Sequence, residues 1–518
     1  MKEIIGRVVG SWRVWLIPLL LVFVYLCFQL SQLSAYGVSW DEPLHRNWGK
    51  IFTLFWRSGD RRLLELMPGH GKYYGPLFFY LNFITSEYFY GNGYLSFVAS
   101  NHVLTVVVSS AIVAVTFFLA RSFGRLKVAF FALIFLLLYP PFLAHAHYNP
   151  KDIPLTAAVL VTAAVFLEGI RRNDSVFFFV SAILFGFAVA VKVNALLMAP
   201  VFGITYLAWL GQSMRASAWH TVLRKQISVL IVSTLLCGLG LYIFWPSAWG
   251  DWHLIKESIV FFTGEDFWPG KVLFFGVEYS GKDLPWFYIP FEYATSLPLL
   301  SLISFIVGFY VFIRAIVRSE RRIEHLFFVL WVVFPLAYSM KPGLVRYDGM
   351  RQFFFTLPAV MIIASSGLVM LLDLLEKRSR KPHAKKVFLG IVLVSLVSQT
   401  VAVYPFGGSY RNELLQIAYQ KNLDRSFQIE YWGPTYKQGM DWLNQNAVPH
   451  PIICVPTAGI LVTWYPWRDD FTFECSTESN YVMFFTRYSE ARAYEELKNP
   501  VFTIERMNSL LLAIYKVQ

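Results

Sequence analysis

The chain alternates long apolar runs with shorter polar connections from near its start to about position 404. Most of these runs are long enough to form a membrane-spanning helix, because about 20 apolar residues in a helix cover the hydrocarbon core of a bilayer. We predict about eleven such helices. Their ranges are about 14–33, 95–120, 128–144, 153–170, 176–191, 195–212, 226–246, 294–313, 326–340, 353–373 and 387–404.

Three further segments are too long to be simple connections, and they cover about 34–94, 247–293 and 405–518. In the first, Leu44, Trp48 and Phe52 recur at helical spacing with basic residues between them. That pattern is typical of an amphipathic helix lying on the bilayer surface. The second is rich in Trp and Phe, which favour the depth of the lipid headgroups.

The last long segment begins a different kind of structure. It contains a helix-like stretch near 436–445 and a β-branched run at 451–456, which together predict a small α/β domain. We therefore divide the chain into a transmembrane domain, 1–404, which carries the outer loops 34–94 and 247–293, and a C-terminal domain, 405–518.

Composition agrees with a membrane protein. Hydrophobic residues make up 56% of the 518 residues and charged residues only 15%, which is too apolar for a soluble protein of this length. The chain is therefore expected to be an integral membrane protein, and we expect a bacterial cytoplasmic membrane.

The distribution of basic residues predicts the orientation. Every second connection, counted from the N-terminus, is rich in Lys and Arg, and these connections hold nearly half of the chain's 45 basic residues. Such loops stay in the cytoplasm, so we expect the N-terminus inside and the C-terminal domain outside. The net charge of +12 largely reflects this signal and attraction to anionic lipids. No basic stripe is interleaved with aromatics, so we expect no nucleic-acid partner.

The four cysteines divide into two pairs. Cys27 and Cys237 fall in predicted spans, where they are expected to pack as small apolar residues. Cys454 and Cys475 both fall in the C-terminal domain. On the outer side of a membrane they are compatible with a disulfide or with two free thiols, and the sequence leaves the choice open.

The ionisable residues avoid the centres of the predicted helices and gather in three outer clusters, at 40–43, 147–152 and 346–351. Transporters accept the cost of charge inside the bilayer to build ion pathways, whereas this chain does not. The predicted topology brings the three clusters to the same side of the membrane. This arrangement favours an active site at the outer membrane surface.

In the first cluster, Asp41 and Glu42 lie between Trp40 and Pro43. A carboxylate held beside an aromatic ring at the membrane interface is suited to act as a general base toward a hydroxyl or an amine. Alternatively, Asp41 simply caps the helix that Pro43 begins. Spacing alone does not separate these two roles, and one residue can perform both.

The other two clusters supply cations. Lys151 stands just before a predicted helix whose N-terminal dipole also attracts anions, although a lysine there is also a common membrane anchor. Arg346 and Arg351 flank Tyr347 and Asp348, and the planar guanidinium groups suit phosphate oxygens. A further outer cation is Lys72. We predict a phosphate-binding set of Lys72, Lys151, Arg346 and Arg351, and substrate contacts from His147, Asn149, Asp152, Tyr347 and Asp348.

At these residues the sequence resembles the membrane glycosyltransferases with the C-type fold, in particular the group related to protein O-mannosyltransferases and to the bacterial lipid A aminoarabinose transferase. The matching segments run through most of the chain. They are Asp41-Glu42, Asn149-Pro150-Lys151-Asp152, the stretch from Gly186 through Lys192-Val193-Asn194 to Pro200, Leu284 to Pro290, Tyr347 to Arg351, and Tyr431-Trp432-Gly433 with Tyr436.

The resemblance implies an inverting transfer of one sugar from a polyprenyl-phosphate donor on the outer membrane face, with Asp41 as the base. The acceptor is expected to be a protein hydroxyl, a lipid or a cell-envelope glycan. Some related enzymes use a divalent metal and others do not. A set of His147, Asp41 and Asp152 could hold one, and its spacing does not decide the question.

Two other classes of function remain open. A lipid or solute transporter would show inverted repeats and polar residues at mid-membrane, which this sequence lacks. A receptor or assembly factor would use its outer C-terminal domain to bind a partner.

Overall fold

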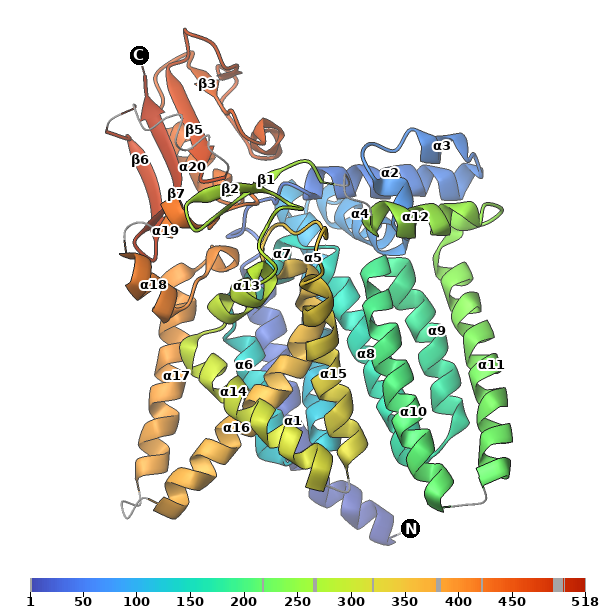
Figure 1. The fold of residues 1–518 in the computed structure, drawn as a ribbon. Helices are drawn as coiled ribbons and strands as arrows, with labels where there is room; N and C mark the ends of the chain where they lie inside the picture. The colour runs from blue at the N-terminus through green and yellow to red at the C-terminus, as the bar shows by residue number, and fades with distance from the viewer. Residues whose placement is uncertain are drawn as a thin grey trace.

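The computed structural model describes residues 2–216, 219–263, 268–318, 321–378, 383–420, 423–487, 497 and 499–517. A bundle of long helices forms the larger part, and a smaller sheet domain stands at one end of it (Figure 1). The helices of the bundle are α1 (Lys2–Ser31), α5 (Phe97–Phe123), α6 (Leu126–Leu137), α7 (Pro140–Tyr148), α8 (Asp152–Arg172), α9 (Ser175–Val191), α10 (Ala199–Ala216), α11 (Trp219–Phe244), α14 (Leu299–Arg318), α15 (Arg322–Ser339), α16 (Leu357–Arg378) and α17 (Ala384–Val403).

All eleven predicted ranges contain a helix, but the predicted count of spans is not confirmed. Among the described residues, eight helices are long and apolar enough to cross a membrane, and α6 with α7 makes a ninth if the pair is one span. Two shorter apolar helices, Leu16–Ser31 and Ser175–Val191, occupy the two remaining predicted ranges.

The predicted span 128–144 is interrupted rather than continuous. Its two parts, α6 and α7, meet at an angle of 62°. Pro140 and Pro141 begin α7, and a proline inside a helix removes a backbone hydrogen bond and clashes with the preceding turn. The break turns α7 into the protein interior, where all nine of its residues are buried.

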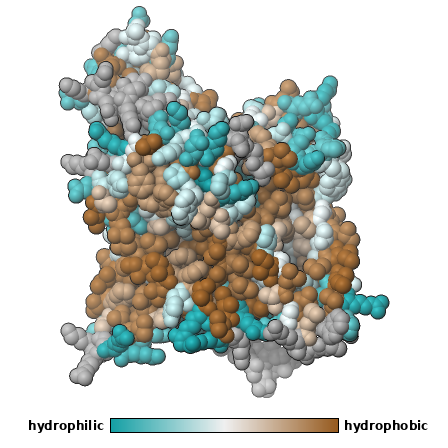
Figure 2. Space-filling view, in the orientation of Figure 1, coloured by the Kyte–Doolittle hydropathy of each residue, from teal (hydrophilic) through white to brown (hydrophobic). Residues whose placement is uncertain are grey.

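The surface of the bundle confirms an integral membrane protein. Figure 2 shows a hydrophobic band across the visible face of the bundle, with hydrophilic residues at both ends. The outermost helices expose large apolar side chains, such as Leu235 on α11 and Val394 on α17, each 68% exposed. Exposed apolar surface of this extent is stable only against lipid.

Helices lying across the end of the bundle form an outer layer (Figure 1). They are α2 (Glu42–Ser58), α3 (Arg62–Glu65), α4 (Leu77–Gly91) and α12 (His253–Thr263). Helix α2 is the predicted amphipathic helix, and it buries Trp48, Phe52 and Phe55 on one face. The connection to α4 packs closely on the bundle, because a Cβ atom at Gly75 would lie only 1.7 Å from the carbonyl oxygen of Ala190.

The predicted outer loop 247–293 also contains a hairpin of β1 (Lys271–Phe274) and β2 (Val277–Ser280), followed by α13 (Tyr288–Ser296). Short 3-10 turns complete the outer segments. These are η1 (Gly71–Tyr73), η2 (Val193–Met198), η3 (Pro246–Ala248), η4 (Arg351–Thr356), η5 (Gly407–Ser409) and η7 (Gly459–Trp464).

The C-terminal domain is a five-stranded mixed sheet with the order β4-β3-β5-β7-β6. Strand β3 runs parallel to β4 and β5, whereas β7 is antiparallel to β5 and β6. The elements are α18 (Glu413–Tyr419), α19 (Leu423–Ser426), α20 (Tyr436–Asn446), β3 (Ile452–Cys454), β4 (Thr472–Phe473), β5 (Tyr481–Phe485), β6 (Phe502–Arg506) and β7 (Ser509–Lys516). The predicted helix near 436–445 and the predicted strand at 451–456 are present as α20 and β3.

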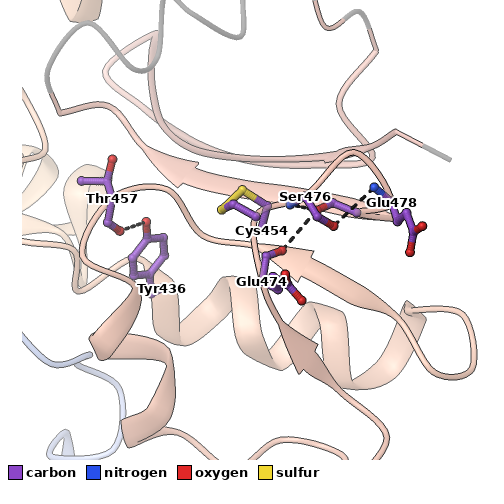
Figure 3. The surroundings of a disulfide bond; sticks show 8 residues. Tyr436, Cys454, Thr457, Glu474, Ser476 and Glu478 are labelled. Carbon is purple, nitrogen blue, oxygen red and sulfur yellow. Dashed lines mark hydrogen bonds between the residues drawn. A yellow bond between two sulfur atoms is a disulfide. The ribbon is translucent and has the colours of Figure 1, made fainter.

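A disulfide joins Cys454 at the end of β3 to Cys475 just after β4 (Figure 3). The sequence was compatible with either a disulfide or two free thiols at these positions, and the structure contains the disulfide. Nearby, the hydroxyl of Tyr436 on α20 donates to the carbonyl oxygen of Thr457 at 2.6 Å (Figure 3). These links tie the helix and two strands of the domain together.

The C-terminal domain lies at the same end of the bundle as α2 and α12, and the N-terminus lies at the opposite end (Figure 1). Direct bonds join it to the first outer loop. The amide of Trp40 donates to the carbonyl oxygen of Trp432 at 2.7 Å, and the amide of Val38 donates to the hydroxyl of Tyr465, also at 2.7 Å. The domain is therefore positioned over the residues that follow α1.

Candidate functional site

The three charged clusters meet in one cavity of about 280 Å³ at the end of the bundle that carries α2 and the C-terminal domain. We call it the polar cavity. Its wall includes Asp41, Lys151, Asp348, Arg351 and Arg487. These residues come from the start of α2, the start of α8, the turn before α16 and the end of β5, so distant parts of the sequence build a single site.

A second cavity of about 310 Å³ adjoins the first, and we call it the apolar cavity. Tyr74, Phe262 and Tyr347 line both cavities. Most of its wall is apolar, and it also includes the cationic residues Lys192 and Arg346. The two cavities thus place a charged chamber beside a hydrophobic one.

Asp41 occupies the N-cap position of α2, but its side chain makes no capping bond. Instead, its Oδ2 atom lies 3.3 Å from Nζ of Lys151 and 3.8 Å from a guanidinium nitrogen of Arg351. Burial raises the pKa of the Asp41 carboxyl, but the two cations outweigh it and hold that pKa well below its usual range. Of the two roles considered for Asp41, the side-chain geometry therefore supports the one in the cavity.

Asp152 lies beneath the polar cavity at the first turn of α8 and is almost fully buried. It accepts bonds from Nζ of Lys192 at 2.6 Å, Arg351 at 3.3 Å and the amide group of Asn149 at 3.1 Å. Asn149 also accepts from the backbone amide of Asp152 at 2.9 Å, which fixes the start of the helix. Asn149 and Asp152 thus hold the cations of the site in position.

The turn before η4 positions Asp348 and Arg351. Asp348 has a φ of 54°, in the left-handed region, and Gly349 follows at 63°. This conformation lets Asp348 pair with Arg351 at 2.8 Å and with Arg487 of the C-terminal domain at 3.0 Å. The guanidinium of Arg351 also lies over the ring of Trp432, at 4.4 Å from its centroid.

Aromatic side chains form much of the remaining wall. Tyr347 stacks on Trp268 with 4.5 Å between the ring centroids. The guanidinium of Arg487 lies 4.9 Å from the ring centroid of Trp40. Flat aromatic faces next to hydrogen-bonding groups are suited to a polar ring with apolar faces, such as a sugar.

A connected set of ion pairs surrounds the polar cavity. Among the described residues it joins three carboxylates, Asp41, Asp152 and Asp348, to four cations, Lys151, Lys192, Arg351 and Arg487. Lys151 and Arg351 line the cavity, and such cations suit an anion such as a phosphate diester.

Asn149 and Asp152, which were predicted to contact the substrate, line neither cavity, and four more predicted site residues have other surroundings. Glu42 turns away from the cavity, and its carboxylate accepts from the amide of Ser39 at 2.6 Å and lies 3.1 Å from His102. His147 contacts the carbonyl oxygens of Leu143 and Gln29 and stacks on Tyr36. Neither Glu42 nor His147 lines the two cavities.

Lys72 and Arg346 are the other two. The ammonium of Lys72 lies 5.0 Å from the ring centroid of Tyr73, and the residue lines neither cavity. Arg346 lines the apolar cavity, but its guanidinium donates to the carbonyl oxygens of Ser339, Leu284 and Lys341. The geometry therefore favours an anchoring role for Arg346.

The proposed metal ligands do not come together. Within the part of the chain that the structure describes, no group of three or more His, Cys, Asp or Glu side chains could hold a metal ion. His147 is bonded to backbone carbonyl oxygens, and Asp41 and Asp152 are paired with cations. The surroundings of His147, Asp41 and Asp152 therefore do not fit a metal site.

The site contains residues that the sequence did not single out. Lys192 belongs to one of the segments that carry the family resemblance, but it was not predicted as a site residue. A lysine between two apolar helices is a feature of the sequence that could have identified it. Burial lowers the pKa of Lys192 to about 8, although Asp152 opposes this. His45 lies one helical turn after Asp41, and that spacing places both on one face of α2. For Arg487, in the tail of the chain, no such signal exists.

No protein-family model and no curated protein matches the chain. Similar solved structures exist. ArnT from Cupriavidus metallidurans bound to undecaprenyl phosphate has a TM-score of 0.48 and 14% identity, over 96% of this chain and 98% of its own. The archaeal oligosaccharyltransferase AglB from Archaeoglobus fulgidus, solved with an inhibitory peptide and a dolichol-phosphate, has a TM-score of 0.51 and 11% identity, over 88% of this chain and 64% of its own.

The Archaeoglobus fulgidus oligosaccharyltransferase tethered to an acceptor peptide gives a similar result, with a TM-score of 0.50 and 12% identity over 90% of this chain and 60% of its own. The two oligosaccharyltransferase similarities, with TM-scores of 0.51 and 0.50, confirm the C-type glycosyltransferase fold that the resemblance implied.

Proposed function

We propose that this chain, whose fold is that of the C-type membrane glycosyltransferases, is an inverting glycosyltransferase. It moves one sugar from a polyprenyl-phosphate donor to an acceptor. The observation that carries the proposal is the meeting of Asp41, Lys151 and Arg351 in the polar cavity, next to an apolar cavity. In this proposal Asp41 is the proton acceptor, the cations are the anion site and the apolar cavity is the lipid site.

The apolar cavity receives the lipid of the donor, and the polar cavity receives its sugar. The phosphate lies between them, where Lys151 and Arg351 bind its oxygens. Both cations line the polar cavity, and their positive charge favours the negative charge of a phosphate diester. The AglB structure, which has the same fold, contains a dolichol-phosphate, and that lipid belongs to the same chemical class.

The reaction follows from this arrangement. An acceptor oxygen attacks the anomeric carbon of the sugar on the face opposite the phosphate, and its proton passes to the Asp41 carboxylate. The bond between the anomeric carbon and the phosphate oxygen breaks, and polyprenyl phosphate leaves. Because phosphate is a stable leaving group, no general acid is required. A single base with several cations is therefore sufficient.

Donor binding also prepares the base. In the structure, Lys151 and Arg351 hold the pKa of Asp41 well below its usual range, which makes the carboxylate a weak proton acceptor. A phosphate that binds the same two cations offsets their charge, so the pKa of Asp41 rises toward its usual value. Proton transfer is thereby linked to the presence of the donor.

The location of the reaction completes the proposal. The basic connections place the N-terminus in the cytoplasm, so the polar cavity and the C-terminal domain face the outer side of a bacterial cytoplasmic membrane. The acceptor is then a protein hydroxyl, a lipid or a cell-envelope glycan. A lipid or solute transporter is not favoured, because the charged residues gather at the end of the bundle.

The test uses the full chain purified into lipid nanodiscs. It is incubated with undecaprenyl phosphates that carry glucose, mannose, galactose or arabinose, together with membrane extracts as a source of acceptors. Mass spectrometry should detect a new glycosylated product and an equal amount of released undecaprenyl phosphate, and NMR of the product should show an inverted anomeric configuration. Release of lipid without inversion, or uptake of solute into liposomes without any sugar transfer, would contradict the proposal.

A further inference from the structure

His45 is a buried histidine that the mechanism above does not use. It lies on α2, four residues after Asp41, and is only 4% exposed. Within the described residues, neither of its ring nitrogens has a hydrogen-bond partner. Buried polar atoms are nearly always bonded in folded proteins, so two open nitrogens on one ring require an explanation.

The other buried histidines differ from His45. His145 contacts the side-chain nitrogen of Asn149 at 2.9 Å, and His147 contacts two backbone carbonyl oxygens. His102 contacts the carbonyl oxygen of Leu33 through Nδ1 at 3.4 Å. These three histidines therefore have protein partners that explain their burial. Among the described residues, His45 has no such partner.

The surroundings of His45 leave one place for a partner. Its ring packs near two hydrophobic faces, with 5.1 Å to the ring centroid of Trp48 and 5.0 Å to that of Phe79. The residue also lines the polar cavity together with Asp41 and Lys151. A group bound in that cavity is therefore the available partner for the imidazole.

The electrostatics define the chemical class of this partner. Burial, together with the positive charge of Lys151, lowers the pKa of His45 to about 3. The neutral ring then offers one donor and one acceptor. A hydroxyl group also has both functions. A phosphate diester has only acceptors, and an ammonium group would be repelled by Lys151 and Arg351.

We propose that His45 hydrogen-bonds a hydroxyl group of the substrate in the polar cavity. The hydroxyl belongs either to the donor sugar or to the acceptor, where it is the attacking group beside Asp41. This inference rests on the proposed function, because it assumes that a sugar donor and its acceptor meet in the polar cavity.

The test compares His45→Phe, which keeps a flat ring without hydrogen bonds, with His45→Gln, which keeps a neutral donor and acceptor. The control is Thr53→Val, because Thr53 is buried on the same helix, bonds only within α2 and does not line the cavity. All are measured in nanodiscs for binding of undecaprenyl phosphate with and without glucose, mannose, galactose or arabinose, and for transfer.

If the hydroxyl is on the donor, His45→Phe weakens binding of the preferred sugar-bearing lipid about tenfold and leaves binding of the sugar-free lipid unchanged. If it is on the acceptor, lipid binding is unchanged and the KM for the acceptor rises about tenfold. In both cases His45→Gln restores part of the loss and Thr53→Val behaves as wild type. Both effects correspond to the loss of one hydrogen bond.

The inference is overturned if His45→Phe stays within twofold of wild type in lipid binding and transfer, as expected if His45 meets only water in the cavity. It is also overturned if Thr53→Val is impaired to the same degree, or if His45→Gln is no better than His45→Phe. Should His45→Phe not fold, His45→Leu takes its place. Failure of the proposed function looks different, because the wild-type protein itself would then transfer no sugar.

Discussion

Lys192 donates to Asp152 at 2.6 Å, and both side chains are almost fully buried. Asp152 in turn accepts from Arg351, which pairs with Asp348 and approaches Asp41. A change in the charge of Lys192 is therefore transmitted to the set of ion pairs around the polar cavity. Because burial lowers the pKa of Lys192 to about 8, that change falls in an accessible pH range.

Sugar transfer should decline as the pH rises through about 8. Loss of the Lys192 proton removes one of the positive charges near the proposed phosphate position, and the donor then binds less well. The Lys192→Arg variant keeps its charge at this pH, so its decline should move to higher pH. The pH dependence of kcat/KM for the donor measures both. A wild-type profile that stays flat from pH 6 to 10 would contradict this assignment.

The titration of Lys192 also predicts a change in stability with pH. Stability should rise with pH, whereas sugar transfer should fall. The pKa of Lys192 is lower in the folded chain than the usual 10.5, so between about pH 8 and 10.5 the unfolded chain holds more protons than the folded chain. The free energy of unfolding of the wild type, relative to Lys192→Met, should therefore increase across this range. Thermal unfolding in nanodiscs at several pH values measures the difference.

Asp41→Asn should lower the transfer rate by about 10² to 10⁴-fold, which is the usual contribution of a positioned proton acceptor. The variant should still bind sugar-free undecaprenyl phosphate, because Lys151 and Arg351 remain. Single-turnover kinetics and lipid binding test the two statements. Glu65→Gln is the matched control, since Glu65 is exposed and lies outside both cavities. Near-normal turnover of Asp41→Asn would remove Asp41 from the mechanism.

Arg351 is the centre of the ion-pair set, within 3.8 Å of Asp41, Asp152 and Asp348. Arg351→Ala leaves each of these three carboxylates with one cation in place of two, so it should destabilise the fold by up to about 3 kcal/mol. Arg351→Lys keeps the charge but not the planar fork, so it should fold better than Arg351→Ala and still bind the donor weakly. Thermal unfolding and donor KM separate these effects. Equal unfolding temperatures for both variants would argue against the bridging role.

The sequence predicted the fold well because hydropathy determines which segments cross a membrane. It could not predict which side chains of a cluster face the cavity. Asp41 and Glu42 are neighbours, but successive helical positions point in different directions, so Asp41 faces Lys151 whereas Glu42 contacts His102. The break at Pro140 was hidden within a continuous apolar run.

The sequence also could not predict that the C-terminal domain contributes Arg487 to the site. Arg487 meets Asp348 only because the sheet domain packs on the outer loops. That packing depends on tertiary contacts such as the hydrogen bond between Trp40 and Trp432. No local sequence pattern near Arg487 predicts these contacts. Residues contributed from another domain are the hardest part of a site to read from one sequence.

Removal of the disulfide should weaken the C-terminal domain. The bond between Cys454 and Cys475 closes a loop with a sequence separation of 21, for which chain entropy predicts a stabilisation of about 3 kcal/mol. The variant Cys454→Ser with Cys475→Ser should therefore be cut faster by protease in this domain, while the helices of the bundle stay protected. Limited proteolysis followed by mass spectrometry maps the cuts. Unchanged cleavage rates would show that the sheet is stable without the bond.

The ion pair between Arg487 and Asp348 also has a consequence for biosynthesis. The ribosome must pass position 487 before that arginine exists, and the β-sheet must then fold against the bundle. A nascent or prematurely ended chain can insert its helices yet cannot complete the chamber in which the sugar would react. The pairing therefore makes completion of the polar cavity depend on the folded C-terminal domain.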